Sequence, residues 1–221
     1  MHRRLLAGLL LVAAGNHSAD AATYSYMASG TLSNSGGLGP PPFPNGTSIS
    51  IQFSIDSATP DSNTADNSTG RYSGLSGTFT LGGQTFSIDS YGYRYVEVSD
   101  NNSYYFGQGD WLWLNVITDN FSSLDTPEYN GSRIHHLSVL MQGNNTGVFS
   151  GDSLSNSIGH DLQLSGGFNL QAGNLVYYNS DAIGPVTAFS SSIVPVPATV
   201  WLLGSALGVL GWIRRKAGIP A

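Results

Sequence analysis

The segment GTSISIQFSID, residues 46–56, alternates apolar and polar side chains at every second position. Ile49, Ile51, Phe53 and Ile55 occupy one set of positions, and serine or glutamine separates them. Successive side chains of a β-strand point to opposite faces of the sheet. The segment is therefore predicted to be a strand with one buried and one hydrated face.

A second segment, GTFTLGGQTFSI at residues 77–88, contains two alternating runs separated by Gly82-Gly83. Two glycines between such runs are typical of a two-residue hairpin turn, because the turn needs positive φ. A hairpin with this turn would place Phe79 opposite Phe86, and Leu81 opposite Gln84.

Short apolar or alternating runs continue along the chain, separated by Gly, Asn, Asp and Ser. No amphipathic helix is evident before residue 195. The additional strands are expected at residues 23–32, 91–95, 111–118, 134–141, 161–170, 175–178 and 185–193, and the proline-rich stretch 33–46 is expected to be a surface loop. The nine or ten strands predict an all-β fold, specifically an antiparallel β-sandwich of jelly-roll-like type.

The N-terminus has the three parts of a secretory signal peptide. Residues 2–4 are basic or histidine, residues 5–14 form an apolar run, and Ala19-Asp20-Ala21 is a small-x-small cleavage site. We expect export through the Sec translocon, with cleavage after Ala21 and residues 1–21 removed. An uncleaved anchor is the alternative, but the apolar run has about half of the roughly 20 residues that a membrane span needs.

The composition of the remaining domain excludes several classes of protein. The chain has no cysteine, which excludes a disulfide scaffold, a cysteine-ligated metal centre and a thiol nucleophile. Residues 22–193 carry three arginines, no lysine and thirteen carboxylates, a formal net charge of −10. A surface with this balance repels phosphate backbones, so nucleic acid is not expected as a partner.

Two patterns point to hydrolases, although neither is complete. GDSLS, residues 151–155, resembles the nucleophile block of GDSL-type serine hydrolases, in which Ser153 would be the nucleophile. That family also has an Asp-x-x-His pair downstream, and none follows here, so a turn is the favoured interpretation. A carboxylate-dependent glycosidase would need two carboxyl groups in one cleft, and the sequence does not locate such a pair. We expect no enzyme activity, with a hydrolase as the alternative.

Metal-binding patterns are similarly incomplete, and no cofactor is expected. The loop at residues 56–70 offers oxygen ligands suited to Ca²⁺, with Asp56, Asp61 and Asp66 as candidates, but it lacks the spacing of an EF-hand. A plain solvated loop is the alternative. His135 and His136 are neighbours in a strand and would point to opposite faces, which prevents them from sharing one ion.

Aromatic residues are concentrated between positions 91 and 113. Flat rings beside amide and carboxylate side chains suit stacking on sugars and recognition of hydroxyl groups. Aromatic side chains also fill β-sheet cores, so the same residues can be structural. The candidate sugar-binding residues are Tyr91, Tyr93, Tyr95, Trp111 and Trp113.

The C-terminal segment 194–221 begins with Val194-Pro195-Val196-Pro197-Ala198, continues with an apolar stretch and reaches Arg214-Arg215-Lys216. As a helix, the apolar stretch 199–213 is about 23 Å long, shorter than the roughly 30 Å hydrocarbon core of a bilayer. The basic end would remain in the cytoplasm, leaving residues 22–193 outside. An ordinary membrane anchor explains the apolarity and the charge, but not the prolines.

These residues resemble the PEP-CTERM sorting signal of Gram-negative bacteria that produce exopolysaccharide. Val194 to Ala198 match its proline motif, with Val196 in the place of the usual glutamate, and WLLGS at 201–205 matches a common continuation. The resemblance implies recognition by an exosortase, a membrane protease, while the C-terminal helix holds the chain in the inner membrane. It further implies a final location at the cell surface or in an extracellular biofilm matrix, with exopolysaccharide as a partner.

Overall fold

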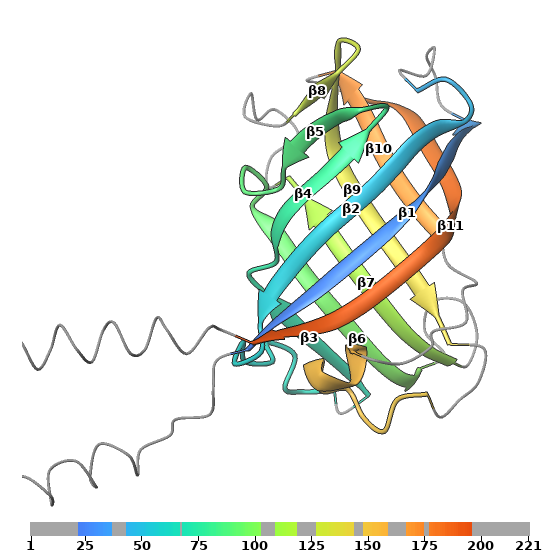
Figure 1. The fold of residues 1–221 in the computed structure, drawn as a ribbon. Helices are drawn as coiled ribbons and strands as arrows, with labels where there is room; N and C mark the ends of the chain where they lie inside the picture. The colour runs from blue at the N-terminus through green and yellow to red at the C-terminus, as the bar shows by residue number, and fades with distance from the viewer. Residues whose placement is uncertain are drawn as a thin grey trace, which may run out of the picture. The chain divides into compact units, whose positions relative to one another are not determined.

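The computed structural model has eleven β-strands and one short 3₁₀-helix among the residues that it describes (Figure 1). These residues are 22–36, 43–66, 68–102, 109–118, 127–143, 148–158, 167–174 and 177–195. The elements are β1 (Ala22–Gly36), β2 (Thr47–Asp56), β3 (Thr69–Ser73), β4 (Ser76–Leu81), β5 (Gln84–Ser87), β6 (Tyr93–Asn102), β7 (Gly109–Ile117), β8 (Glu128–Tyr129), β9 (Ser132–Gln142), η1 (Leu154–Ser157), β10 (Gly167–Asn174) and β11 (Tyr177–Pro195). The predicted all-β class is confirmed.

The strands form one curled sheet in the order β3-β6-β7-β9-β10-β11-β1-β2-β4-β5, with β8 paired to β9 (Figure 1). The strand pairs whose register is defined are antiparallel, as expected. The expected jelly roll would have divided its strands between two sheets through Greek-key connections. Here most neighbouring strands are consecutive in the chain. The single sheet curls around the core, whereas a jelly roll would enclose its core between two sheets.

The two segments with the clearest sequence patterns fold as predicted. Strand β2 alternates strictly between buried and more exposed side chains, with Ile49, Ile51, Phe53 and Ile55 buried. Strands β4 and β5 pair with Phe79 opposite Phe86 and Leu81 opposite Gln84. Both turn glycines have positive φ, 54° at Gly82 and 88° at Gly83.

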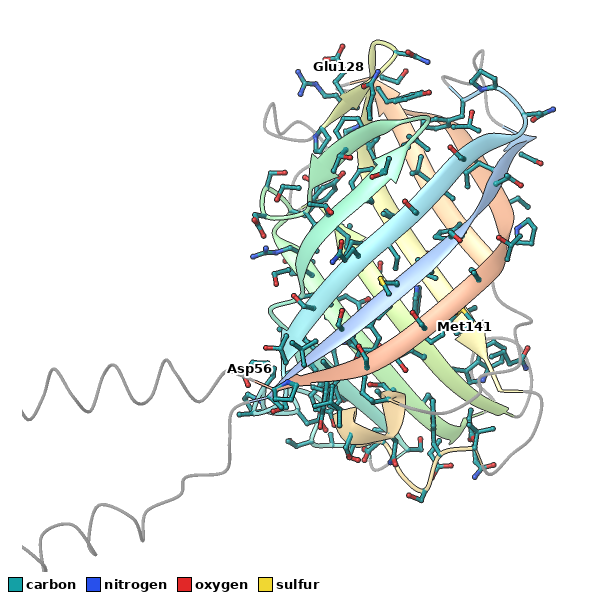
Figure 2. The ribbon with its side chains drawn as sticks, in the orientation of Figure 1. Asp56, Glu128 and Met141 are labelled. Atoms are coloured by element: carbon teal, nitrogen blue, oxygen red, sulfur yellow. The ribbon has the colours of Figure 1, made fainter. Side chains whose placement is uncertain are left out.

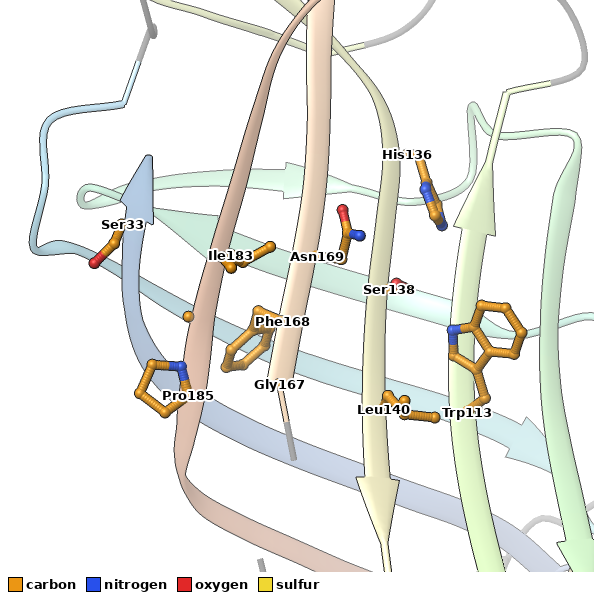
Figure 3. Close-up of a pocket in the computed structure, with 11 residues that line it drawn as sticks. Ser33, Trp113, His136, Ser138, Leu140, Gly167, Phe168, Asn169, Ile183 and Pro185 are labelled. Atoms are coloured by element: carbon orange, nitrogen blue, oxygen red, sulfur yellow. The ribbon is translucent and has the colours of Figure 1, made fainter. Parts of the chain in front are cut away.

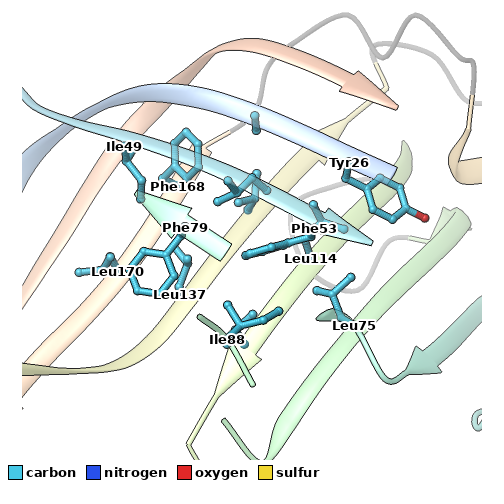
Figure 4. Close-up of a cluster of buried hydrophobic side chains, with 14 of the residues drawn as sticks. Tyr26, Ile49, Phe53, Leu75, Phe79, Ile88, Leu114, Leu137, Phe168 and Leu170 are labelled. Atoms are coloured by element: carbon cyan, nitrogen blue, oxygen red, sulfur yellow. The ribbon is translucent and has the colours of Figure 1, made fainter. Parts of the chain in front are cut away.

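The hydrophobic core lies inside the curl, where side chains from both halves of the sheet meet (Figure 4). Phe53 and Phe79 come from β2 and β4, while Leu114, Leu137 and Phe168 come from β7, β9 and β10. Tyr91 also lies in the core, and its hydroxyl donates a hydrogen bond of 2.9 Å to the Ile134 carbonyl oxygen. Burial raises the pKa of Tyr91 well above its usual range, so the hydroxyl keeps its proton and remains a donor.

Strand β11 corrects one expectation, because two separate strands were predicted at residues 175–178 and 185–193. The structure has a single strand from Tyr177 to Pro195. The Gly184-Pro185 pair suggests a break because proline lacks the N–H that a ladder needs. Pro185 pairs with Gly167, the first residue of β10, at the end of the β10–β11 ladder. The missing donor is tolerated there, and the strand continues past it.

The described residues contain no helix long and apolar enough to cross a membrane. The helix expected at 199–213 and the signal peptide at 1–21 lie outside the described residues. One compact unit extends from Tyr24 to Ile193.

Candidate functional site

The strands β6, β7, β9 and β10 turn a second set of side chains away from the core. Pairing aligns Tyr95 with Asn115, Asn115 with Ser138, and Ser138 with Asn169. The adjacent row aligns Glu97, Trp113, Leu140 and Gly167. We call this surface the aromatic-polar face and define it by Tyr95, Glu97, Trp113, Asn115, His136, Ser138, Leu140, Gly167 and Asn169.

A hydrogen-bonded chain of side chains stiffens one half of the aromatic-polar face. The Asn115 amide donates to the Tyr95 hydroxyl at 2.7 Å, and its oxygen lies 2.8 Å from His136 Nε2. Because an amide oxygen only accepts, Nε2 is the donor in this pair. The Arg71 guanidinium lies 4.8 Å from the centre of the Tyr95 ring and donates to Glu97 at 2.9 and 3.2 Å. These contacts fix the Tyr95 and His136 side chains before any ligand binds.

An open trough of about 600 Å³ crosses the aromatic-polar face from β7 to β1 (Figure 3). Its apolar side is formed by Trp113, Leu140 and Pro185, with Gly167 between the last two. Gly167 has no side chain, which leaves a gap in an otherwise continuous row. A volume of this size lies within the range of small-ligand sites, roughly 300–1,000 Å³.

The polar side of the trough contains His136, Ser138 and Asn169 (Figure 3). The Oδ1 atom of Asn169 is buried and has no hydrogen-bond partner among the described residues. A buried polar atom left in this state costs about 1–3 kcal/mol, so a donor supplied by a ligand would be favoured there. The trough thus combines the Trp113 ring and an apolar wall with several side chains that can form hydrogen bonds to hydroxyl groups.

The five aromatic residues singled out in the sequence have different environments. Trp113 lines the trough, and Tyr95 belongs to the hydrogen-bonded chain beside it. Trp111 is only 6% exposed, Tyr91 is in the core, and Tyr93 is 60% exposed at the start of β6. Because side chains two residues apart in a strand share a face, Tyr93, Tyr95, Trp111 and Trp113 lie on the same side of the sheet, and of these four Trp113 lines the trough.

Sequence reasoning missed the polar partners, above all Asn115, Ser138 and Asn169. One signal was available, since Asn115 interrupts the apolar run of WLWLNVI and is only 1% exposed. A buried amide inside a strand needs partners, and this marks the position as part of a polar network. Which strands supply those partners depends on sheet order, which the sequence pattern does not contain.

A second, smaller groove of about 480 Å³ lies over β1, β2, β4 and β11. Its described lining includes five serine or threonine residues, and Phe189 is the one aromatic residue among them and the other described lining residues. The part of this groove that the structure describes offers less ring surface than the trough and contains no histidine. Phe189 is consequently a useful control position for tests of Trp113.

The GDSLS segment contains a bend and the start of η1. The hydroxyl of Ser153 is 2.9 Å from the Ser155 hydroxyl and accepts a bond of 3.1 Å from the Asn156 amide. The same segment closes against the sheet, because the Tyr26 and Ser157 hydroxyls are 2.6 Å apart and the Tyr72 hydroxyl donates to the Asp152 carbonyl oxygen at 2.9 Å. These contacts give the segment a packing role. His160 lies outside the described residues.

The three aspartates proposed for calcium each stabilise a local turn. Asp56 accepts a hydrogen bond from the Ala58 N–H, and Asp61 accepts from the N–H groups of Asn63 and Arg71. Asp66 accepts from the backbone and hydroxyl of Ser68, which lowers its pKa. No group of three or more potential metal ligands occurs within the described part of the chain. The structure thus does not bring Asp56, Asp61 and Asp66 together as one site.

The glutamates are also separated. Glu97 is buried beneath its ion pair with Arg71 on the aromatic-polar face, whereas Glu128 is an exposed residue of β8. Asp56 and Glu128 lie at opposite ends of the curled sheet (Figure 2). These positions do not form the cleft with two carboxyl groups that a glycosidase would need.

Asp100 lies beside the buried Asp110, and its own pKa is raised. Partial burial, and then the charge of the neighbouring Asp110, raises the pKa of Asp100 above its usual value. Asp110 is buried and accepts from the N–H groups of Asn101 and Phe149. The folded state binds the Asp100 proton more tightly than the unfolded state does, so protonation of Asp100 stabilises the fold. This stabilisation is complete below the ordinary pKa of aspartate and is lost as pH rises through the raised pKa of Asp100.

Asp100→Asn is therefore expected to raise the melting temperature at pH 7 and to have no effect at pH values below the ordinary pKa of aspartate. The expected gain is at most about 1 kcal/mol, because solvent screens the group. Thermal unfolding of both proteins across this pH range measures the difference. Asp66→Asn is the control and should give no gain at pH 7, since hydrogen bonds lower the pKa of Asp66. An unchanged melting temperature for Asp100→Asn at pH 7 would contradict the expectation.

Of the sorting motif, Val194 and Pro195 are described and end strand β11. Val194 is 49% exposed. Val196, Pro197, Ala198, the basic residues Arg214, Arg215 and Lys216, and the cleavage residues Ala19 and Ala21 lie outside the described residues. Comparison with protein-family models, curated proteins and solved structures found no significant match.

Proposed function

We propose that the chain is an exported, non-enzymatic protein of the bacterial cell surface or extracellular matrix that binds polysaccharide through the trough. The trough is the observation that carries this proposal. Trp113 provides a ring for stacking, and Ser138 and Asn169 provide partners for hydroxyl groups along the same depression. Sugar rings have apolar faces and hydroxyl-bearing edges, so they match a surface built from both kinds of side chain.

The test of this proposal is retention of the full chain on exopolysaccharide from the producing cells. Trp113→Ala is expected to weaken retention at least roughly tenfold, because truncating an aromatic anchor of a binding site costs about 2 kcal/mol or more. Phe189→Ala, in the second groove, is the matched control and should bind as the unmodified chain does. Equal binding by the Trp113 variant and the unmodified chain would refute a role for the trough.

We further propose that the C-terminal segment directs this protein to its site of action. In this proposal the signal peptide initiates export, the apolar stretch at 199–213 holds the chain in the inner membrane, and an exosortase-type protease then acts at the motif 194–198. The similarity of that segment to PEP-CTERM signals supports the proposal. The mass of the C-terminus should decrease in cells with an intact exosortase and stay at full length without it. An intact tail in both strains would indicate an ordinary anchor.

A further inference from the structure

We infer that the ligand of the trough is an internal stretch of a neutral polysaccharide, laid across the strands from β7 to β1, and that Gly167 creates the space for it. This inference rests on the proposed function and deepens it by assigning the ligand class and its direction. Two observations together support the inference. The described lining of the trough has an apolar row and a polar row but no aspartate, glutamate, lysine or arginine, and the domain around it is strongly negative.

The length and openness of the trough favour a chain over a single sugar. Its lining comes from five adjacent strands, from Trp113 on β7 to Ser33 on β1. Four inter-strand spacings of about 4.8 Å give a span of roughly 19 Å. Several sugar rings are needed to cover that distance. An open trough also lets a longer chain pass beyond both ends, which a closed pocket would prevent.

The two sides of the trough lie in neighbouring rows of the sheet, which sets the orientation of the ligand. Trp113, Leu140 and Pro185 form the apolar row, and Ser138 and Asn169 belong to the polar row (Figure 3). A sugar chain running along these rows places ring faces on the first and hydroxyl edges on the second. A hydroxyl both donates and accepts, so it can satisfy Asn169 Oδ1 once the amide turns about its broad terminal torsion.

Charge selects a neutral chain over an acidic one. The described residues that line the trough include no arginine, lysine, aspartate or glutamate. The guanidinium of Arg71 is paired with Glu97, and that of Arg94 is paired with Asp89. The net charge of −10 over residues 22–193 would repel a chain of uronates or sulfates. The described lining residues include no lysine or arginine that would offset that repulsion.

Gly167 offers a way to fill the trough without disturbing the fold. It sits in the apolar row between Leu140 and Pro185. Among the described residues, a Cβ atom there would meet only the Gly184 carbonyl oxygen, at 3.5 Å, which is ordinary van der Waals contact. The backbone of Gly167 is not in the left-handed region, so valine can adopt it. Valine also favours strands, and its side chain would project into the space assigned to the ligand.

The experiment measures binding of the full chain to neutral oligosaccharides of graded length and to oligouronates of the same lengths, at low and high salt. The expected result is binding of neutral chains that strengthens with length and hardly changes with salt. Gly167→Val should weaken this binding about tenfold or more while the melting temperature stays the same or rises. Gly167→Ala, with a smaller side chain, is the matched control and should bind nearly as well as the unmodified chain.

Two results would overturn the inference while leaving polysaccharide binding intact. One is equal or stronger binding of oligouronates, and the other is unchanged binding of neutral chains by Gly167→Val while Trp113→Ala still weakens binding. If the unmodified chain binds neither class of oligosaccharide nor the exopolysaccharide itself, the proposed function fails as well. The two failures are therefore distinguishable.

Discussion

Phe79→Ala is expected to lower the free energy of unfolding by about 3–5 kcal/mol. Phe79 is 1% exposed, pairs with Ile51 of β2, and lies 5.1 Å from the Phe86 ring, measured between ring centres. Truncation removes this contact and leaves a cavity between the two halves of the curled sheet, where neighbouring side chains relax only partially. The loss is a large fraction of the roughly 5–15 kcal/mol that stabilises a typical domain.

Chemical denaturation of the full chain measures this loss as a shift of the unfolding midpoint. Tyr93→Ala is the matched control, because it truncates an aromatic residue that is 60% exposed. Its effect should stay within about 0.5 kcal/mol, as for most surface substitutions. A Phe79 variant as stable as the Tyr93 variant would contradict the packing described for this core.

Gly184→Ala is expected to lower the free energy of unfolding by about 3 kcal/mol, at the upper end of the usual cost of overpacking. A Cβ atom at Gly184 would overlap the Thr31 carbonyl oxygen on the neighbouring strand β1. Because that obstacle is backbone, it cannot be relieved by rotating a side chain, and β11 must move away from β1. Both strands contribute to the trough, so its β1 end should widen too.

Gly167→Ala provides the contrast, since Gly167 is paired with Pro185, next to Gly184. The added methyl group has room there, and alanine reduces the entropy of the unfolded chain, so the variant should be as stable as the unmodified protein or up to about 1 kcal/mol more stable. Denaturation of the two glycine variants side by side measures the difference. Equal losses at both positions would mean that neither glycine has the environment described here.

The local sequence pattern was sufficient to predict burial and register where one face of a strand is buried and the turn residues are distinctive. The alternation in β2 and the Gly82-Gly83 turn predicted burial and register correctly, because both depend only on strand geometry and on backbone conformations that glycine accepts. The same reasoning predicted two strands where the structure has the single strand β11, because a proline inside a strand usually ends the hydrogen-bonded ladder. Only the position of Pro185 beside the first residue of β10 explains why it is accommodated.

The candidate site was harder to predict because its residues come from separate strands. Trp113 was identified as an aromatic strand residue, but Asn115, Ser138 and Asn169 were not identified as its polar neighbours. Their alignment requires the neighbour order β7-β9-β10, and no local pattern encodes which strands pair. Likewise, the three aspartates within residues 56–70 looked equivalent in sequence, whereas each accepts hydrogen bonds from a different set of local groups.

The amino-acid sequence by itself determined the all-β class, the two-faced strands and the acidic charge, because these follow from composition and from the two-residue period of a strand. The tertiary structure alone decided that the strands curl into one sheet and that Trp113, Ser138 and Asn169 share a trough with a gap at Gly167. The physical reason is that strand pairing is non-local. Register and neighbour order are selected by packing of the whole core, and they place distant residues side by side.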